Sequence, residues 1–281
     1  MYNRSTPEMP MTPPDTNIVE TAVSQEEAKR PRVPAVERAT RLLAMLEAAP
    51  LRRFGISEIS RVLQIPKSTA LNICNALLEA QFVRRSDDGY QLGRRLVQLG
   101  TAYVSSVQLV QEFYEACKVV PPEIQAMVQL AVLSDGLEAI YLARQDFQSG
   151  LQLGLRGEIG RRTPANCTGI GKALLAALPA HELNTRIAGL RSLPTLTERS
   201  ISDPDALRAE LERIRKAGYA VDDEEVLPGI ACIACNIITL HRDDGVIAVS
   251  ITARKETQSP GMFELRRDAL FDLADSLDRR L

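Results

Sequence analysis

Residues 34–93 contain three helical patterns in a row, directly followed by a hairpin pattern, and this order constrains the fold more than any other feature of the sequence. Apolar residues recur at helical spacing over 34–50, in "ISEISRVLQI" with Ser57 as the expected N-cap, and after Pro66. "FVRRSDDGYQLG" places Asp-Asp-Gly between two extended runs, which indicates a β-hairpin. Together these patterns predict a winged helix-turn-helix domain over residues 34–95.

The rest of the chain predicts a linking helix and a second domain. Apolar residues at helical spacing before Pro121-Pro122 predict a linker helix over residues 96–120. Strand patterns then flank Asp135-Gly136 and Asp243-Asp244-Gly245, and helices are expected in "GIGKALLAALP", in "SDPDALRAELERIRKAG" and from about Met262. Ser202 or Asp203 is the expected N-cap of the second of these helices, and Gly218 its end. Residues 121–281 are therefore expected to form an α+β domain with an antiparallel sheet.

Residues 1–33 lack hydrophobic periodicity and are rich in Pro, Thr, Glu and Ser, so we expect a disordered tail. The tail has no apolar segment of the kind that a secretory signal needs, and the chain has no run of about 18 apolar residues. A cytoplasmic location without a membrane partner is therefore expected. In a reducing compartment the five cysteines are expected to be free thiols.

Charge is distributed unevenly along the chain. Residues 34–95 contain ten Lys and Arg against six Asp and Glu, a net charge of +4, although the whole chain carries −2. The remainder must then carry −6. A basic segment joined to an acidic one indicates a division of roles, with nucleic acid as the expected partner of the basic segment.

Six residues of the basic segment are candidate DNA contacts. Free N–H groups, two hydroxyls and a cation at the start of the third helix suit a phosphate, although Ser and Thr at such positions are commonly caps. An Asn on the exposed face of that helix can bond to adenine, and two Arg in the hairpin can reach flanking DNA, with an ordinary solvated surface as the alternative for both. The six residues are Lys67, Ser68, Thr69, Asn72, Arg84 and Arg85.

The C-x-x-C in "GIACIACNIITL", formed by Cys232 and Cys235, raises the alternatives of a metal site or a redox pair. A zinc site needs about four ligands, and no second Cys or His pair stands at a usual spacing. The run is apolar and β-branched, so a strand is favoured, and residues three apart on a strand point to opposite faces. The two thiols are therefore not expected to converge.

No other motif predicts catalysis. The chain has two histidines, His181 and His241, so few Ser–His or Cys–His pairs are possible. "GIGKA" lacks the spacing of a phosphate-binding loop. "DDEE" at residues 222–225 could bind a cation, but acids at a strand start more commonly solvate a loop. We therefore predict no catalytic residue, no metal site and no cofactor.

Several of these segments together resemble the IclR family of bacterial transcription regulators. The resemblance runs from about Val33 to the C-terminus through "RVPAVERATRLLAMLE", "ISEISRVLQIPKSTALNICNALLEAQFV", "GYQLGRRLVQLG", "RTPANCTGIGKALLA" and "GYAVDDEEVLPGIACIA". It implies a winged helix-turn-helix followed by a GAF-like effector domain. It also implies a dimer, or a dimer of dimers, that binds a palindromic operator and responds to a small, often carboxylated metabolite.

The resemblance also implies a set of effector-binding residues, carried over onto three segments of this chain. They are Gly169 and Ile170 in "CTGIGKA", Asp222 and Cys232 in "DDEE…GIAC", and Ser250 and Thr252 in "VSIT". N–H groups at a helix start are anion receptors, and residues two apart on a strand share a face, so these groups suit a carboxylate. This chain departs from the family at Asn72, where Arg is usual, and at Cys235-Asn236, where Ala-Pro is usual.

We therefore expect a DNA-binding transcription regulator that is controlled by a small organic acid and is not an enzyme. Effector binding is expected to change the spacing of two winged helices across a dimer. Two rival functions stay open at this point. One is a thiol-dependent enzyme that uses the winged helix for assembly, and it requires a reactive Cys232. The other is an architectural DNA-binding protein without an effector.

Overall fold

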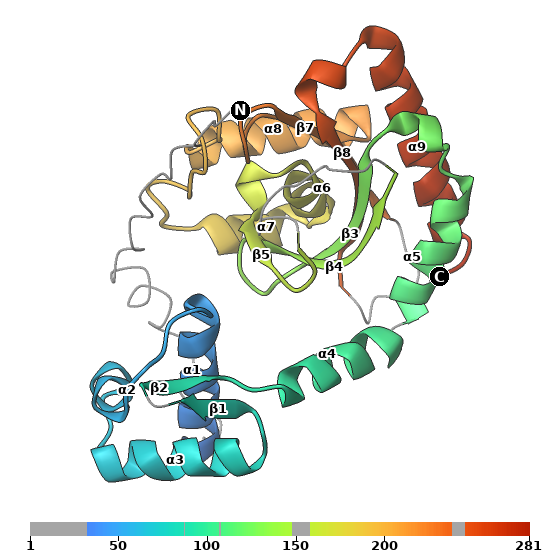
Figure 1. The fold of residues 1–281 in the computed structure, drawn as a ribbon. Helices are drawn as coiled ribbons and strands as arrows, with labels where there is room; N and C mark the ends of the chain where they lie inside the picture. The colour runs from blue at the N-terminus through green and yellow to red at the C-terminus, as the bar shows by residue number, and fades with distance from the viewer. Residues whose placement is uncertain (1–32, 87, 107, 148–157, 238–244) are drawn as a thin grey trace, which may run out of the picture. The chain divides into compact units, whose positions relative to one another are not determined.

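The structure is a computed structural model that describes residues 33–86, 88–106, 108–147, 158–237 and 245–281 (Figure 1). Contacts divide the chain into two compact units, one ending at Gln98 and the other beginning at Leu99. The predicted tail before Val33, His241 and the turn at Asp243-Asp244 lie outside the described residues.

The first unit is a winged helix-turn-helix, as predicted. Its elements are α1 (Pro34–Ala48), α2 (Ile56–Leu63), α3 (Lys67–Glu79), β1 (Val83–Ser86) and β2 (Gly89–Leu92), with β1 and β2 paired antiparallel. Backbone N–H and C=O groups of Phe54 and Tyr90 bond to each other and add a short bridge to this hairpin. The core of the unit is formed by Leu42, Leu46, Phe54, Ile59, Leu63, Ala70, Cys74, Val83 and Tyr90.

The predicted N-cap of α2 is wrong. Gly55, not Ser57, is the capping residue, because its carbonyl oxygen already accepts the N–H groups of Glu58 and Ile59. Ser57 is therefore inside the first helical turn, where its hydroxyl cannot take the capping position. The turn between α2 and α3 is closed by the Ser60 hydroxyl, which donates to the carbonyl of Ile65 at 2.6 Å.

The segment predicted as a linker helix is helical on both sides of residue 107, which lies outside the described residues. The two described parts are α4 (Arg95–Ser106) and α5 (Gln108–Ala116), and a short 3-10 helix follows at Cys117–Val119. The boundary between the two compact units falls within α4. The helical segment ends before Pro121, as the sequence predicts, and a separate 3-10 helix follows at Pro122–Ile124.

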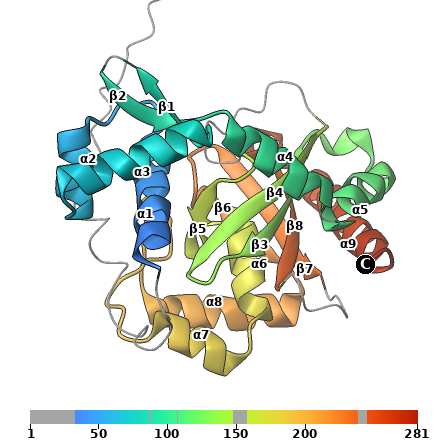
Figure 2. The ribbon, with the colours of Figure 1, turned by 90° about the horizontal axis from the view of Figure 1, so that it is seen from below.

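The second unit contains an antiparallel sheet of the predicted kind. Its strands are β3 (Met127–Leu133), β4 (Glu138–Asp146), β5 (Arg162–Pro164), β6 (Ala220–Asp223), β7 (Ile230–Ile237) and β8 (Ile247–Arg254), in the order β5-β4-β3-β8-β7-β6. Helices α6 (Gly169–Ala177), α7 (Ala180–Ile187) and α8 (Pro204–Ala217) lie on one side of the sheet (Figure 2). Helices α5 and α9 (Pro260–Asp278) lie on the other side. The unit is therefore a three-layer α+β domain.

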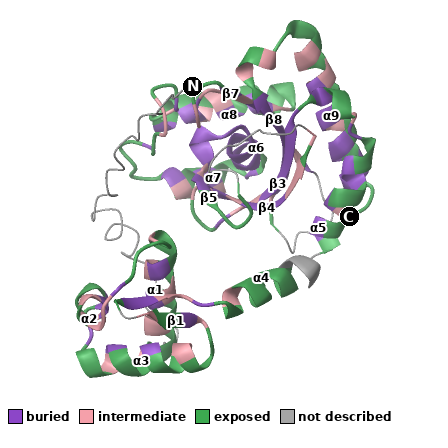
Figure 3. Ribbon diagram, in the orientation of Figure 1, coloured by how far each residue is buried: buried purple, intermediate pink, exposed green. Residues whose placement is uncertain are grey.

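Alternation along the strands builds two cores of different character. On the α9 face large side chains such as Leu130, Val249 and Ile251 pack against α5 and α9. On the α6 face small ones such as Ala131 and Ala248 leave room for a helix close to the strands. Figure 3 shows α6 and the central strands as the most continuously buried part of this unit.

Two helix starts in this unit are fixed by side-chain caps. The Asp203 carboxylate accepts the N–H of Ala206 at 2.7 Å, so Asp203 rather than Ser202 caps α8, and Gly218 ends it with a φ of 80°. Helix α9 begins at Pro260 because the Ser259 hydroxyl accepts the N–H of Met262, so the predicted start at Met262 is two residues late. Within the described residues, no helix is long and apolar enough to cross a membrane.

Candidate functional site

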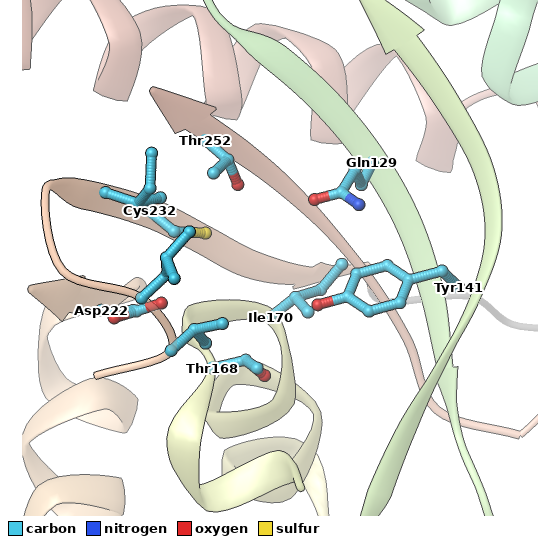
Figure 4. A pocket seen from close by; sticks show the side chains of 10 residues that line it. Gln129, Tyr141, Thr168, Ile170, Asp222, Cys232 and Thr252 are labelled. Carbon is cyan, nitrogen blue, oxygen red and sulfur yellow. The ribbon is translucent and has the colours of Figure 1, made fainter. Parts of the chain in front are cut away.

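A partly open cavity lies between the N-terminal end of α6 and the strands of the second unit (Figure 4). The space there that protein atoms leave unfilled is about 380 Å³, counted together with solvent at its open side. The lining residues are Gln129, Tyr141, Thr168, Ile170, Asp222, Val226, Leu227, Ile230, Cys232 and Thr252. None of these is a Lys, Arg or His, so a ligand in this cavity is met by neutral donors, by helix N–H groups and by one carboxyl group.

The start of α6 is held close to β7 by its capping residue and by two glycines. The Thr168 hydroxyl accepts the N–H of Gly171 at 2.8 Å. A Cβ on Gly171 would lie 2.4 Å from the backbone of Ala165, and one on Gly169 would lie 3.1 Å from the Cys232 sulfur. Only glycine fits Gly171 without movement of the backbone. The first N–H groups of α6, which lack helical acceptors and carry partial positive charge, therefore lie next to the strands.

The register of the sheet brings the strand side chains of the cavity together. Cys232 pairs with Asp222 on β6 on one side and with Thr252 on β8 on the other. Gln129 of β3 pairs with Ser250, two residues before Thr252. Residues paired across antiparallel strands share a face, so these side chains all point toward α6. In Figure 4 the Cys232 thiol and the Tyr141 ring lie on opposite sides of the space.

Asp222 is the carboxyl group of the cavity, and it is 3% exposed. Burial raises its pKa to about 7, although the N–H groups of Glu225 and Val226 bond to the carboxylate and oppose the rise. The bond from Glu225 N–H is 2.7 Å long. At neutral pH a substantial fraction of Asp222 is therefore protonated, and a protonated carboxyl can donate a hydrogen bond to an anion.

Beneath the cavity, α6 carries a buried ion pair. The ammonium of Lys172 lies 2.5 Å from one carboxylate oxygen of Glu225 and 3.8 Å from Glu210. Burial raises the pKa of Glu225, and the nearby Lys172 opposes this. The pair joins α6 to the turn after β6, and β6 itself carries Asp222. It therefore fixes the two sides of the cavity relative to each other.

The other polar groups of the cavity are neutral. The hydroxyls of Thr163 and Thr168 hydrogen-bond with the Tyr141 hydroxyl, and burial raises the pKa of Tyr141. Burial raises the pKa of the Cys232 thiol to about 12, so this thiol stays protonated at neutral pH. A protonated thiol is a weak nucleophile, which counts against a reactive Cys232.

The structure brings together most of the residues carried over from the family resemblance. Ile170, Asp222, Cys232 and Thr252 line the cavity. Ser250 lies two residues before Thr252 on β8, where it is fully buried beside the Cys232 thiol. The backbone of Gly169 lies close to Cys232. This residue therefore contributes close packing and a backbone N–H group.

The C-x-x-C is divided between the two faces of β7, as predicted. Cys232 faces the cavity, whereas Cys235 packs in the core against α9, and all five cysteines are free and buried. The described residues contain no group of three His, Cys, Asp or Glu arranged to hold a metal ion.

The four acids of the "DDEE" segment are not all exposed on a loop, as the sequence suggests. The segment ends β6 instead of starting a strand. Asp222 is buried on the strand and Glu225 is buried by the turn that follows, while Asp223 and Glu224 are partly exposed. Arg199 and Lys255 neutralise the two outer acids at distances of 2.6–2.8 Å. The pKa of Glu224 is lowered to about 2, chiefly by its hydrogen bond with Lys255.

In the first unit the six candidate DNA contacts lie on α3 and the hairpin. Lys67, Ser68 and Asn72 are exposed on α3, and Thr69 is half-buried beside them. The residue before α3 is Pro66, and no side chain caps the first N–H groups of this helix. Arg84 and Arg85 are exposed on β1, where the guanidinium of Arg85 lies 5.8 Å from the centre of the Tyr90 ring.

Comparisons with known proteins agree with this architecture. Residues 35–87 match the sequence model of the IclR helix-turn-helix domain, and residues 101–278 match that of the bacterial transcriptional regulator IclR C-terminal domain. The glycerol operon regulatory protein of Streptomyces coelicolor is 32% identical over 80% of this chain and 86% of its own length. The transcriptional regulator XynR of Escherichia coli is 30% identical over 79% of this chain and 86% of its own length.

Solved structures give the same result. The IclR of Thermotoga maritima is 26% identical, with a TM-score of 0.64 over 89% of this chain and 99% of its own. An IclR homologue from Microbacterium hydrocarbonoxydans, complexed with 4-hydroxybenzoate, shares the fold at 22% identity, with a TM-score of 0.69 over 87% and 99% of the two chains.

The fold and the matches define a transcriptional regulator with an N-terminal helix-turn-helix domain and a C-terminal effector-binding domain. The chain belongs to the IclR family of bacterial transcription regulators.

Sequence reasoning missed several residues of the site. Thr168 directly precedes the "GIGKA" helix and could have been found as its N-cap. Gln129 is a single polar residue in an apolar strand, and Tyr141 carries a hydroxyl in another. A polar group in an otherwise apolar strand is a signal that could have indicated both residues. In the sequence Lys172 belongs to a run that only partly matches a phosphate-binding loop, and nothing local indicates that it is buried.

Proposed function

We propose that this regulator binds operator DNA through α3 and the β1–β2 hairpin, and that a small carboxylic acid in the cavity modulates this binding. The observation that carries the proposal is the composition of the cavity wall. It combines the start of α6 with the carboxyl of Asp222 and the neutral donors Cys232 and Thr252.

The chemistry of the wall favours a monoanion. Helix N–H groups stabilise a carboxylate, and a protonated Asp222 can donate a hydrogen bond to it. A second negative charge would have no cation to offset it, because none of the residues that line the cavity is a Lys, Arg or His. Tyr141 and Gln129 offer hydrogen bonds to a polar group at the other end of the acid. The relative bound to 4-hydroxybenzoate has a ligand of this type.

The surface of α3 supports the DNA side of the proposal. Lys67 and Ser68 stand at its exposed N-terminal end, where phosphates are commonly bound, and Asn72 is one turn further on. Arg84 and Arg85 extend the basic surface onto the hairpin. We assign phosphate contacts to the Lys, Arg and hydroxyl side chains and base reading to Asn72.

Self-association is part of the proposal, because a symmetric operator is read by two copies of a helix-turn-helix. Helix α4 exposes large apolar side chains, with Val97 71% exposed and Tyr103 54% exposed. Such residues in a helix between two domains suit contact with a second copy of the chain. A change of effector occupancy would then alter the spacing of the two α3 helices.

The proposal is tested by calorimetric titration of the full chain with short aliphatic and aromatic monocarboxylates and with matched dicarboxylates. We expect at least one monocarboxylate to bind, and Thr252→Val, which keeps the side-chain shape, to weaken it by about tenfold through loss of one hydrogen bond. Thr185→Val on the exposed face of α7 is the matched control and should bind like the wild type. Failure of every acid to bind, or equal binding to Thr252→Val, would overturn the assignment.

A further inference from the structure

The carboxyl group of Asp222 lies next to the place where the carboxylate of the proposed ligand binds. The first two N–H groups of α6, those of Gly169 and Ile170, have no acceptor within the described residues, because the Thr168 cap bonds further on, at Gly171. A Cβ on Gly169 would lie 3.5 Å from the backbone nitrogen of Asp222, so the helix start is in contact with β6. Asp222 also lines the cavity (Figure 4). A carboxylate held by these N–H groups therefore lies beside the carboxyl of Asp222.

The positive charge nearest to this carboxyl is already used. Lys172 acts on Asp222, but it is not among the residues that line the cavity. Its ammonium pairs with Glu225 at 2.5 Å and lies 3.8 Å from Glu210. An ionised ligand beside an ionised Asp222 would thus place two like charges in a buried site whose described wall holds no cation. Two carboxylates about 3 Å apart do not both stay ionised.

The other titratable groups around Asp222 do not exchange protons near neutral pH. They face it from β4, from β7 and from the 3-10 helix at Ala165–Cys167, and they are Tyr141, Cys232 and Cys167. Burial raises the pKa of each of these groups above its ordinary value, so all three stay protonated and neutral between about pH 6 and 8.5. Asp222 is therefore the group of the wall that takes up a proton when an anion binds.

Resting on the proposed function, we propose that the cavity binds a weak acid together with one proton, so that the regulator responds to the undissociated acid and not to its anion alone. The proton passes from solvent to Oδ2 of Asp222, because Oδ1 already accepts the N–H of Glu225 at 2.7 Å. The Oδ2–H group then donates to the ligand carboxylate, and the proton returns to solvent when the ligand leaves. Where Asp222 is ionised in the free protein, the amount of complex follows the product of the anion and proton concentrations. That product is proportional to the concentration of undissociated acid.

The state of Asp222 in the free protein sets the pH range of this coupling. Burial raises its pKa to about 7. Below this pH the proton is already bound, so the acid takes up none on binding. Above it one proton enters with each acid, and the dissociation constant of the acid rises about tenfold per pH unit.

We titrate the full chain with acetate, butyrate, benzoate and 4-hydroxybenzoate by calorimetry, in phosphate and in Tris, because the two buffers differ in ionisation enthalpy. The difference in heat between the buffers counts the protons taken up. For the acid that binds most tightly we expect uptake near zero at about pH 6 and near one proton per site at about pH 8.5. We also expect a dissociation constant at least about tenfold weaker at the higher pH.

Asp222→Asn replaces the protonated carboxyl by a neutral amide of the same shape that can donate to the ligand. This variant should bind the acid equally at both pH values, without proton uptake, and more tightly than the wild type at the higher pH. Asp135→Asn, in the exposed turn between β3 and β4, is the matched control and should keep the wild-type dependence. Wild-type binding without proton uptake at the higher pH overturns the inference, whether or not the variant folds. Uptake that persists in Asp222→Asn overturns it as well. If none of the four acids binds, the proposed function fails instead.

The same coupling is expected in the response of DNA binding. We use a duplex that the wild-type chain selects from a random-sequence library, and an acid concentration that half-saturates the cavity at about pH 6. This acid should change the dissociation constant of the wild-type chain for the duplex more at about pH 6 than at about pH 8.5. For Asp222→Asn the change should be equal at the two pH values. An equal change in the wild type would contradict the inference.

Discussion

The ammonium of Lys172 and the carboxylate of Glu225 form an ion pair inside the effector domain, with a separation of 2.5 Å and the lysine 1% exposed. Lys172 is in the second turn of α6, and Glu225 follows β6 by two residues. The second carboxylate oxygen of Glu225 has no hydrogen-bond partner among the described residues. The pair therefore satisfies each charge chiefly through the other.

Lys172→Met is expected to lower the free energy of unfolding by about 3–5 kcal/mol, because it leaves a buried carboxylate without its cation. The double variant K172M/E225L removes both charges and should recover most of this loss. Urea unfolding of the full chain measures both. A single variant as stable as the wild type would mean that the pair contributes little.

The raised pKa of Asp222 predicts a specific pH dependence of stability. The folded protein keeps the Asp222 proton up to about pH 7, whereas the unfolded chain loses it near the ordinary value of 3.8. The folded state thus binds more protons between these values, so the free energy of unfolding falls as pH rises through this window. The raised pKa of Glu225 has the same sign, and the lowered pKa of Glu224 acts in the opposite sense below about pH 4.5.

Asp222→Asn isolates the contribution of this one group. We expect the variant to gain stability relative to the wild type as pH rises from 5 to 8, because it carries no buried charge to ionise. Urea titrations at a series of pH values measure the difference. A difference between the two proteins that does not change with pH would show that Asp222 ionises normally in the folded state.

The two glycines of α6 are expected to differ in their tolerance of alanine. A Cβ on Gly171 would meet backbone atoms of Ala165 at 2.4 Å, which forces the helix start to move, and we expect a loss of about 3 kcal/mol. A Cβ on Gly169 would meet the Cys232 sulfur at 3.1 Å, so the loss should be smaller, and Cys232→Ala in the same chain should relieve it. Thermal unfolding gives the order. Equal losses at the two positions would contradict the geometry.

Asn72 and the hairpin arginines are expected to affect DNA binding in different ways. Asn72→Ala should cost about 1–3 kcal/mol on the selected duplex and relax the preference at one base pair, because it removes a base contact. Arg84→Ala and Arg85→Ala should weaken binding to all sequences alike and reduce the salt slope by about 1 each. Fluorescence anisotropy on selected and scrambled duplexes separates the two. An equal loss for Asn72→Ala on both duplexes would remove its base-reading role.

Much of the fold could be predicted because it is encoded locally. The helical periods, Pro66 and Asp-Asp-Gly sufficed for the winged helix-turn-helix, and the strand period sufficed to separate Cys232 from Cys235. The N-cap of α2 was mispredicted because serine is a good cap, and only the backbone bonds of Gly55 show which residue occupies the position.

The rest of the site depends on contacts between distant segments. Gln129 and Tyr141 reach the cavity only through the pairing of β3 with β8 and β4. The burial of Lys172 depends on Glu225, which lies 53 residues further along the chain. The raised pKa of Asp222 likewise follows chiefly from burial in the folded domain, to which the charge of Glu225 adds a smaller rise.

The most direct test of the account measures DNA affinity while the cavity is filled. The full chain and Thr252→Val are titrated against the selected duplex, with and without the monocarboxylate that binds the wild type. We expect the acid to change the wild-type dissociation constant by about 5-fold to 150-fold, the usual range of allosteric coupling, and to change that of Thr252→Val far less at the same concentration. An acid that occupies the wild-type cavity but leaves its affinity for the duplex unchanged would contradict the account.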